Sequence, residues 1–341
     1  MKKSVKFILA IPSAIVLLLL LALSYIHLTN LEVDRQLRLR GFITDRFMDM
    51  DIAAGGNGGF TLRACDIVIT EERFIETRDG RQMRVLVFRP ASRQPNATGF
   101  LWIHGGGFRV GAPDLEFDIA RQFIQTANTV VVSPQYRLSP QAPFPAAFND
   151  VYDTLLWMKN NASYLGVNPE QLFVGGGSAG GGLAASVALY ARDSGDVNIA
   201  FLMPLYPMIN DMMNTPSAIG NTALVWNSRR NYEAWKLYLG DLFLSRHVPT
   251  HAAPARETDF SNLPPTYTFV GDLDPFFCDT IAFVNNLRAD GVWVQFDIYR
   301  GAFHGFDIIA PNARISREAI GRTLEVFRYA TENFFVAQNE H

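Results

Sequence analysis

Cysteine is scarce in this chain of 341 residues, which contains only Cys65 and Cys278. Two cysteines so far apart form neither a Cys-X-X-Cys pair nor a zinc-binding spacing, and they cannot build a disulfide framework. Because their neighbours are apolar, we expect two buried thiols rather than one disulfide. The scarcity excludes a small disulfide-stabilised fold and a cysteine-based metal centre.

The chain also lacks an excess of charge of either sign. Its 30 Lys and Arg against 33 Asp and Glu leave a net charge of −3 at pH 7. This balance gives no reason to expect nucleic acid or an acidic polymer as a partner. The hydrophobic share of 48%, which includes 26 Phe, indicates a globular protein with a large core or an apolar pocket.

Residues 7–28 contain no Asp, Glu, Lys or Arg at all, and they follow the basic start "MKKSVK". This run reaches the roughly 20 apolar residues that span a bilayer, and it is longer than the usual core of a secretory signal. We therefore expect residues 1–30 to be an uncleaved signal-anchor, with a cleaved signal peptide and secretion as the alternative. Basic residues flank the run on both sides and leave its orientation undecided. We favour a folded domain on the outer side of the membrane, periplasmic or extracellular.

From residue 61 to residue 341, short apolar runs alternate with helical patterns. The stretches "DIVITEERFIET" and "MRVLVFRP" on either side of "RDGR" predict a hairpin. The alternation that follows predicts an α/β fold, with a mostly parallel, doubly wound sheet covered by helices on both faces. Residues 208–255 interrupt the alternation, and together with residues 31–60 we expect them to form a helical cap.

The stretch "GGGSAGGG" at residues 175–182 lies between a predicted strand and a predicted helix. It lacks the lysine of a phosphate-binding loop, and it fits the dinucleotide pattern GxGxxG only loosely. Residues 176–180 match G-x-S-x-G, in which a tight strand-to-helix turn lifts a serine clear of the sheet. We therefore interpret Ser178 as a nucleophile.

A serine nucleophile needs a base and an acid. His304 in "GAFHGFD" follows the predicted strand "VWVQFDIYR", and strand ends in a doubly wound sheet share the edge that carries Ser178. The acid is expected between the serine and the histidine, where "GDLDPFFCD" offers Asp272, Asp274 and Asp279. We prefer Asp274, because the proline after it favours extended geometry at the strand end, and we keep Asp272 as the main rival.

The stretch "HGGGF" at residues 104–108 also ends a predicted strand. Glycines let backbone N–H groups come close to a developing oxyanion. Gly105 and Gly106, together with the N–H of Ala179, are therefore predicted oxyanion donors. A nucleophile elbow, a downstream histidine and a glycine loop in this order predict acyl-transfer chemistry.

These motifs resemble the hormone-sensitive-lipase-like carboxylesterases of the α/β-hydrolase superfamily over roughly residues 85–335, and "YRLSPQAPFP" looks like their "YRLAPEHPFP". The resemblance implies an α/β-hydrolase fold with a helical cap, a small-molecule ester as substrate, and no cofactor or metal. It implies hydrolysis of short- to medium-chain acyl esters through an acyl-enzyme. By motif it assigns Ser178 as nucleophile, Asp274 as acid, His304 as base, Gly105, Gly106 and Ala179 as oxyanion donors, and His104 as a brace of the glycine loop.

Two positions depart from the family pattern. Gly177 stands where relatives usually have Asp or Thr, and Gly182 stands where they often have Asn. Both changes remove a polar side chain, so we expect a looser elbow and lower activity, but still an enzyme. An amidase, deacetylase or lactonase with the same triad, and a non-catalytic ligand-binding or adhesion protein, stay as alternatives, and a homodimer is left open.

Overall fold

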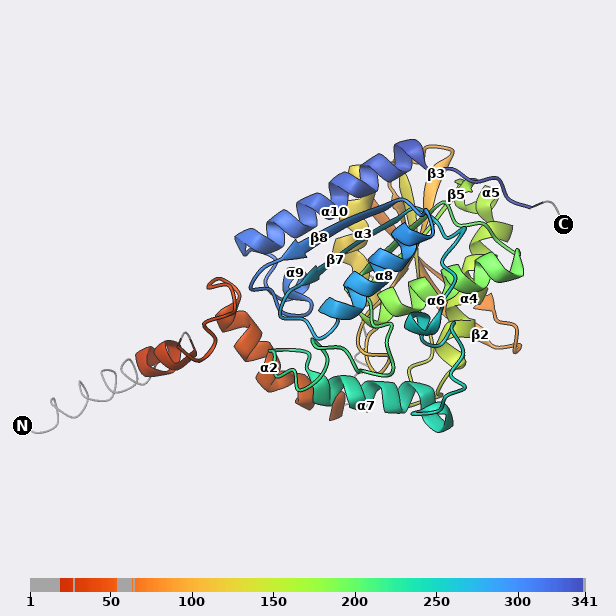
Figure 1. Ribbon diagram of the computed structural model, residues 1–341. Helices are drawn as coiled ribbons and strands as arrows, with labels where there is room; N and C mark the ends of the chain where they lie inside the picture. Colours follow the sequence, from red (N-terminus) through yellow and green to blue (C-terminus); the bar gives the residue numbers. More distant parts are fainter. Residues whose placement is uncertain (1–18, 27, 54–62, 64, 340–341) are drawn as a thin grey trace, which may run out of the picture.

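A computed structural model describes residues 19–26, 28–53, 63 and 65–339, and in these residues eight strands form one sheet (Figure 1). The sheet order is β1-β2-β4-β3-β5-β6-β7-β8. β1 and β2 form the predicted antiparallel hairpin, β2 is also antiparallel to β4, and the other neighbours are parallel. The strands are β1 (Val68–Glu76), β2 (Gln82–Pro90), β3 (Ala97–Ile103), β4 (Thr129–Pro134), β5 (Val167–Gly177), β6 (Phe201–Leu205), β7 (Thr266–Gly271) and β8 (Val294–Tyr299).

Helices cover both faces of this sheet. On one face α3 packs beside α10, and on the other α4, α6 and α8 pack against the strands (Figure 1). The predicted α/β fold with a doubly wound, mostly parallel sheet is therefore confirmed. The helices are α3 (Phe117–Thr126), α4 (Ala146–Asn160), α5 (Ala162–Leu165), α6 (Ala179–Ser194), α8 (Phe277–Ala289), α9 (Phe306–Ile309) and α10 (Arg314–Asn333).

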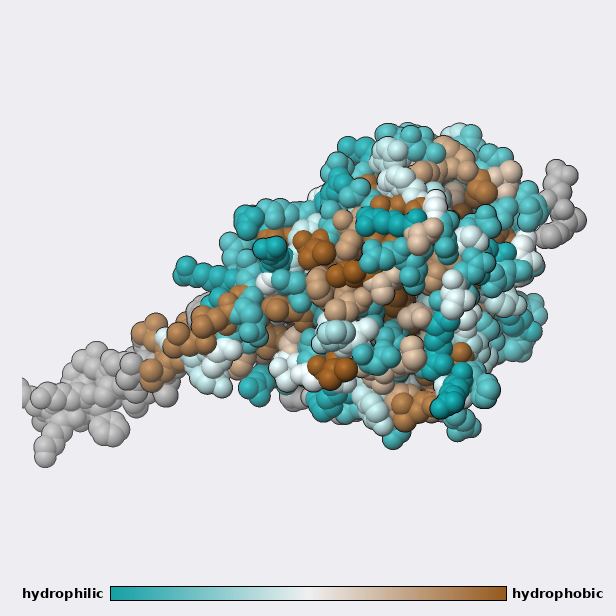
Figure 2. All heavy atoms as spheres, viewed as in Figure 1, coloured by the Kyte–Doolittle hydropathy of each residue, from teal (hydrophilic) through white to brown (hydrophobic). Residues whose placement is uncertain are grey.

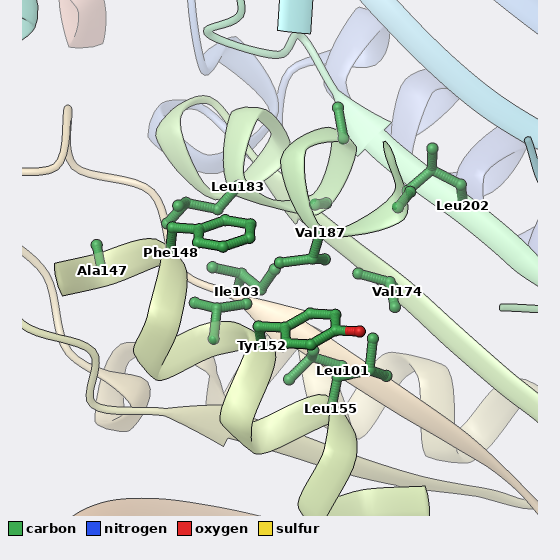
Figure 3. Close-up of a cluster of buried hydrophobic side chains, with 14 of the residues drawn as sticks. Leu101, Ile103, Ala147, Phe148, Tyr152, Leu155, Val174, Leu183, Val187 and Leu202 are labelled. Atoms are coloured by element: carbon green, nitrogen blue, oxygen red, sulfur yellow. The ribbon is translucent and has the colours of Figure 1, made fainter. Parts of the chain in front are cut away.

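The central strands are buried along their whole length, as is typical of parallel strands with helices on both faces. Figure 3 shows Leu101 and Ile103 of β3 facing Phe148 of α4 and Leu183 of α6. Each such side chain contributes about 1.5–3 kcal/mol when it is fully buried. This packing holds the ends of β3 and β5, and the loops that follow them, in fixed positions.

The two segments that the sequence predicts as a cap are distant in sequence but joined in the structure. Helices α2 (Arg38–Ala53) and α7 (Ser228–Leu239) lie together at one end of the molecule (Figure 1). Arg230 Nη1 of α7 lies 2.6 Å from Asp45 Oδ1 of α2, and the buried guanidinium makes this link a firm one. A Cβ on Gly41 would come within 2.5 Å of the Phe303 ring, so α2 rests directly on the loop that carries His304.

The cap insertion is less helical than its sequence predicts. Within residues 208–255 the described helices are α7 and the short η2 (Gly240–Leu242), with η3 (Pro254–Arg256) at the end, and turns and loops make up the rest. Residues 54–60 of the predicted N-terminal cap segment lie outside the described residues. The division into an N-terminal segment, a cap segment and a catalytic domain stays a prediction.

Residues 1–18 of the predicted signal-anchor also lie outside the described residues. In the part of the chain that the structure does describe, no helix is both long and apolar enough to cross a membrane. The described segment that follows is strongly apolar and exposed, and Figure 2 shows it projecting from the body near the N-terminus. Its exposed large side chains include Leu19, Leu20, Leu21, Tyr25, Leu28 and Leu31.

The expectation of two buried thiols is wrong. Both cysteines are free, but Cys65 is exposed and Cys278 is partly exposed. Cys65 lies just before β1, the strand at the edge of the sheet, and its backbone pairs with that of Val68.

Candidate active site

Ser178 occupies the sharp strand-to-helix turn that G-x-S-x-G predicts. It connects β5 to α6 and has a φ of +60°, in the left-handed region that residues other than glycine rarely adopt. The turn is held because Ser178 N–H donates to the carbonyl of Leu205 at 3.0 Å. Gly180 is required there, since a Cβ would lie 2.0 Å from the carbonyl oxygen of Ile103.

His304 lies between the serine and a carboxylate. Its Nε2 is 2.8 Å from Ser178 Oγ, and its Nδ1 is 2.6 Å from Asp274 Oδ2. Asp274 follows β7, His304 follows β8, and Ser178 follows β5, so three strand ends at one edge of the sheet supply the group. All three side chains are buried, Asp274 with 1% of its surface exposed. The structure thus brings together the three residues that the motifs single out.

The other two carboxylates of "GDLDPFFCD" have different partners. Asp272 Oδ1 accepts from the N–H of Gly301 at 2.7 Å, and so braces the loop before His304. Asp279 Oδ1 accepts from the Asn210 side chain at 2.9 Å, and burial raises the pKa of Asp279 to about 6. Neither carboxylate is hydrogen-bonded to His304 among the described contacts.

The glycine loop after β3 lies against the elbow. A Cβ on Gly105 would be 3.0 Å from the Gly177 carbonyl oxygen and 3.4 Å from Ser178 Cβ. His104 Nδ1 donates to the Gly105 carbonyl at 2.8 Å, and its ring stacks on Tyr136 at 4.1 Å. Burial lowers the pKa of His104 to about 4, which keeps the ring neutral at working pH. These contacts suit a brace of the loop rather than a base.

Of the predicted oxyanion donors, Gly105 and Ala179 lie next to Ser178, and Gly106 follows Gly105 in the same loop. Ala179 is the first residue of α6, where N–H groups have no partner within the helix. Among the described loop and turn backbone hydrogen bonds, none is donated by Gly105, Gly106 or Ala179. None of the three N–H groups is thus used by these bonds, and the α6 N-terminus adds a partial positive charge next to Ser178.

At the two positions that depart from the family pattern, the segment after β6 fills the space that a side chain would take. A Cβ on Gly177 would lie 3.0 Å from the Tyr206 hydroxyl oxygen, and a Cβ on Gly182 would lie 2.2 Å from the Met208 carbonyl oxygen. Met208 N–H also donates to the Ser178 carbonyl at 3.0 Å. The expected loosening of the elbow is therefore not what the structure has, because close packing replaces the missing side chains.

Aromatic rings surround the histidine. The His304 ring centre lies 5.0 Å from that of Phe276, 5.2 Å from Tyr206 and 6.0 Å from Trp226 of the cap. Trp226 lies in the segment 208–255 that the sequence predicted as part of a cap, and the sequence did not single out Tyr206 or Phe276. Of the other cap residues, Trp235 packs against Phe108 and Tyr238 instead. The position of Tyr206 directly after a parallel strand was the signal that could have placed it here.

The sequence was compared with protein-family models and with known proteins. A family model for the alpha/beta hydrolase fold matches residues 100–308. Carboxylesterase NlhH of Mycobacterium tuberculosis is 32% identical over 263 residues, which are 76% of this chain and 82% of the relative. Ethyl acetate hydrolase of Pseudomonas putida is 28% identical over 68% of this chain and 74% of its own.

A solved structure agrees with these relatives. A bacterial heroin esterase superposes with a TM-score of 0.79 and 30% identity, over 89% of this chain and 99% of that one. The chain therefore belongs to the α/β-hydrolases, in their hormone-sensitive-lipase-like carboxylesterase family. In keeping with that family it is a carboxylic ester hydrolase.

Proposed function

We propose that the protein is a serine carboxylesterase that cleaves short- to medium-chain acyl esters through a Ser178–His304–Asp274 triad. The observation that carries this proposal is the continuous hydrogen-bonded chain from Ser178 Oγ through the His304 ring to Asp274, at 2.8 and 2.6 Å. A base within hydrogen-bond reach of the nucleophile, itself oriented by a buried carboxylate, is the geometry that activates a serine.

In the acylation step, Ser178 Oγ attacks the ester carbonyl while His304 Nε2 takes its proton. Asp274 accepts from Nδ1, which holds the ring in the tautomer with a free Nε2 and stabilises the imidazolium that forms. The negative oxygen of the tetrahedral intermediate is placed toward the N–H groups of Gly105, Gly106 and Ala179. Each such donor contributes on the order of 3 kcal/mol in the transition state.

His304 then protonates the leaving alcohol, and the acyl group stays on Ser178. In the second half, His304 takes a proton from water, which attacks the acyl carbonyl. The bond to Ser178 Oγ then breaks, the acid leaves, and His304 returns the proton to Oγ. The low exposure of the triad, with 8% of Ser178 and 5% of His304 accessible, suits this sequence because the charges develop in a largely dry site.

A preference for short acyl chains is supported by the crowding around Ser178. Trp226 of the cap approaches the glycine loop so closely that a Cβ on Gly107 would lie 2.4 Å from its ring. Together with Phe276 and Tyr206, this ring leaves little width beside His304. The relative named ethyl acetate hydrolase also points toward small acyl groups.

A chain-length series tests the proposal. The full-length protein, purified in mild detergent, is assayed on p-nitrophenyl esters from acetate to palmitate, with p-nitroacetanilide as the matched amide. We expect the highest kcat/KM between two and about eight acyl carbons, and a burst of one p-nitrophenol per enzyme when deacylation is slow. An optimum at palmitate would contradict the short-chain proposal, and faster cleavage of the anilide would favour an amidase.

We also propose that the N-terminal apolar segment tethers the enzyme to a membrane, with its catalytic domain on the outer side. The support is the uncharged run of residues 7–28 and the exposed leucines that continue it. We expect the full-length protein to stay with membranes in alkaline carbonate, and a variant without residues 1–30 to become soluble. If the expressed protein were instead found in the medium and had lost residues 1–24, signal cleavage and secretion would be favoured.

A further inference from the structure

We propose that Tyr206 and Asp307 form a positioning pair for His304, in which Asp307 acts as a second carboxylate that favours the charged imidazolium. This inference rests on the proposed triad and extends it, because neither residue belongs to the triad or to the oxyanion donors. It also accounts for Gly177, whose missing side chain leaves room for the pair.

Tyr206 connects the nucleophile to the base. Its hydroxyl oxygen lies 3.0 Å from the position that a Cβ on Gly177 would take, next to Ser178. The ring meets that of His304 edge-on, with 5.2 Å between the ring centres. Tyr206 is 2% exposed, and its backbone has a φ of +34°, which a non-glycine residue adopts only where its surroundings impose it. A phenol held so tightly restrains the His304 ring and packs against the backbone of Gly177, the residue before the nucleophile.

Asp307 holds the phenol from the other side. The Tyr206 hydroxyl donates to Asp307 Oδ2 at 3.3 Å. Asp307 follows His304 by three residues, in the first turn of α9. Its other oxygen is buried without a well-aligned hydrogen bond, and the nearby N–H groups of Asp307 and Ile308 only partly offset the cost of burial. A buried carboxylate that is only partly satisfied is costly to keep, which indicates a function beyond packing.

The charge of Asp307 changes a little below neutral pH. Burial raises the pKa of Asp307 to about 6, and His304 is among the groups whose charge acts on it. Above that pH, the carboxylate favours protonated His304, because an opposite charge stabilises the charged form. The negative charge therefore supports the imidazolium of the transition state, in addition to Asp274.

Other titratable groups pack around the pair and have to be distinguished from it. Asp274 after β7 and Glu116 of η1 (Pro113–Glu116) act on Tyr206, and Asp274 also acts on Asp279 of α8. On the two helices that pack against α9, Asp45 is paired with Arg230, Arg314 is paired with Glu318, and Arg317 donates to the carbonyl of Asn312. Among the described contacts, Asp307 is hydrogen-bonded to the Tyr206 side chain, and none of these other groups is.

The principal test is Asp307→Asn, measured as kcat and KM from pH 5 to pH 9 on p-nitrophenyl acetate. We expect kcat to fall about three- to tenfold with KM nearly unchanged, and the acid midpoint of kcat/KM to move down by about half a pH unit. The shift is downward because the imidazolium loses a negative neighbour that stabilises it. Asp153→Asn is the matched control, since Asp153 is similarly buried at 9% but pairs with Arg78 on the hairpin turn, so its loss is expected to leave the midpoint in place.

Thermal stability separates positioning from packing. The folded pKa of Asp307 lies above its ordinary value of 3.8, so the charged form costs stability, and that cost grows as pH rises from 3.8 through about 6. Asp307→Asn should therefore raise Tm at pH 8 by a few degrees and by less at pH 4.5. A merely structural aspartate would lower Tm at pH 8 and leave the pH midpoint unchanged, which would overturn the proposal.

A double-mutant cycle tests the link through Gly177. Gly177→Ala pushes a methyl group against the Tyr206 hydroxyl, so we expect a several-fold loss of kcat in the wild-type background. In Tyr206→Phe the hydroxyl is absent and the closest remaining ring atom is 3.2 Å away, so the same substitution should cost less. Equal penalties in the two backgrounds would contradict the coupling.

These outcomes are distinct from those of the proposed function. A wild-type enzyme without Ser178-dependent hydrolysis would overturn both proposals. An active wild type whose Asp307→Asn variant keeps its kcat and its acid midpoint would overturn only the positioning pair.

Discussion

Ser178→Ala lowers kcat on p-nitrophenyl acetate by about 10⁴-fold or more, while KM changes little. Without Oγ no acyl-enzyme forms, and only the glycine loop and general binding of the ester remain. The side chain makes one hydrogen bond, to His304, so its loss should shift Tm by no more than a degree or two. Steady-state kinetics and the absence of an acyl adduct in intact-protein mass spectrometry measure the effect.

Ser186→Ala is the matched control for this result. Ser186 is buried on the same helix, α6, two turns beyond the nucleophile. We expect it to retain activity within about twofold, because a substitution distant from the triad has little effect on the transition state. Hydrolysis by Ser178→Ala at the wild-type rate would mean that another group attacks the ester, and the assigned nucleophile would be wrong.

Much of this fold could be predicted because its signals are local. Runs such as "GFLWI" and "TVVVSP" are apolar throughout, as strands between two helix layers must be, and "RDGR" has the residues of a tight hairpin turn. The elbow was equally local, since a serine between small residues at a strand end has few other uses. Chain order and the shared sheet edge then indicated His304.

The acid and the cap were harder to predict, because they depend on contacts between distant segments. Asp272 and Asp274 both follow β7, and only the tight turn from Gly271 to Asp274 decides which of them meets His304. The cap loops between Met208 and Ser228 have no periodic pattern, since they are held by contacts to Asp279, Asp45 and Pro275 rather than by helix formation.

Gly177 also shows that contacts between distant segments are hard to predict from sequence. A sequence reveals that a side chain is missing, but it does not reveal which neighbour takes the space. The departure predicted a weaker elbow, whereas Tyr206 from the end of β6 fills the gap.

Because Tyr206 fills this gap, Gly177→Asp, which would restore the family residue, should lower activity here. The new side chain would crowd Tyr206 and add a carboxylate beside Asp307.

Asp274→Asn lowers kcat by about 10⁴-fold, the second-largest effect we expect. The Phe276 N–H donates to Asp274 Oδ1 at 2.9 Å, so an asparagine would keep its oxygen there and turn its NH₂ toward His304 Nδ1. The ring would then carry its proton on Nε2, where it cannot accept one from Ser178. The imidazolium would also lose its closest counter-charge. Both losses act on the chemical step, so KM should stay within about threefold.

Asp272→Asn distinguishes the two carboxylates of this loop. Asp272 accepts from the N–H of Gly301, and an asparagine oxygen can keep that hydrogen bond in weaker form. We expect kcat to fall less than about tenfold, together with a small loss of Tm, because the substitution acts on the loop rather than on the ring. The comparison needs kcat, KM and Tm for both variants under the same conditions. If Asp272→Asn abolished activity and Asp274→Asn did not, the acid would be Asp272, and the 2.6 Å contact between Asp274 and His304 would have only a structural role.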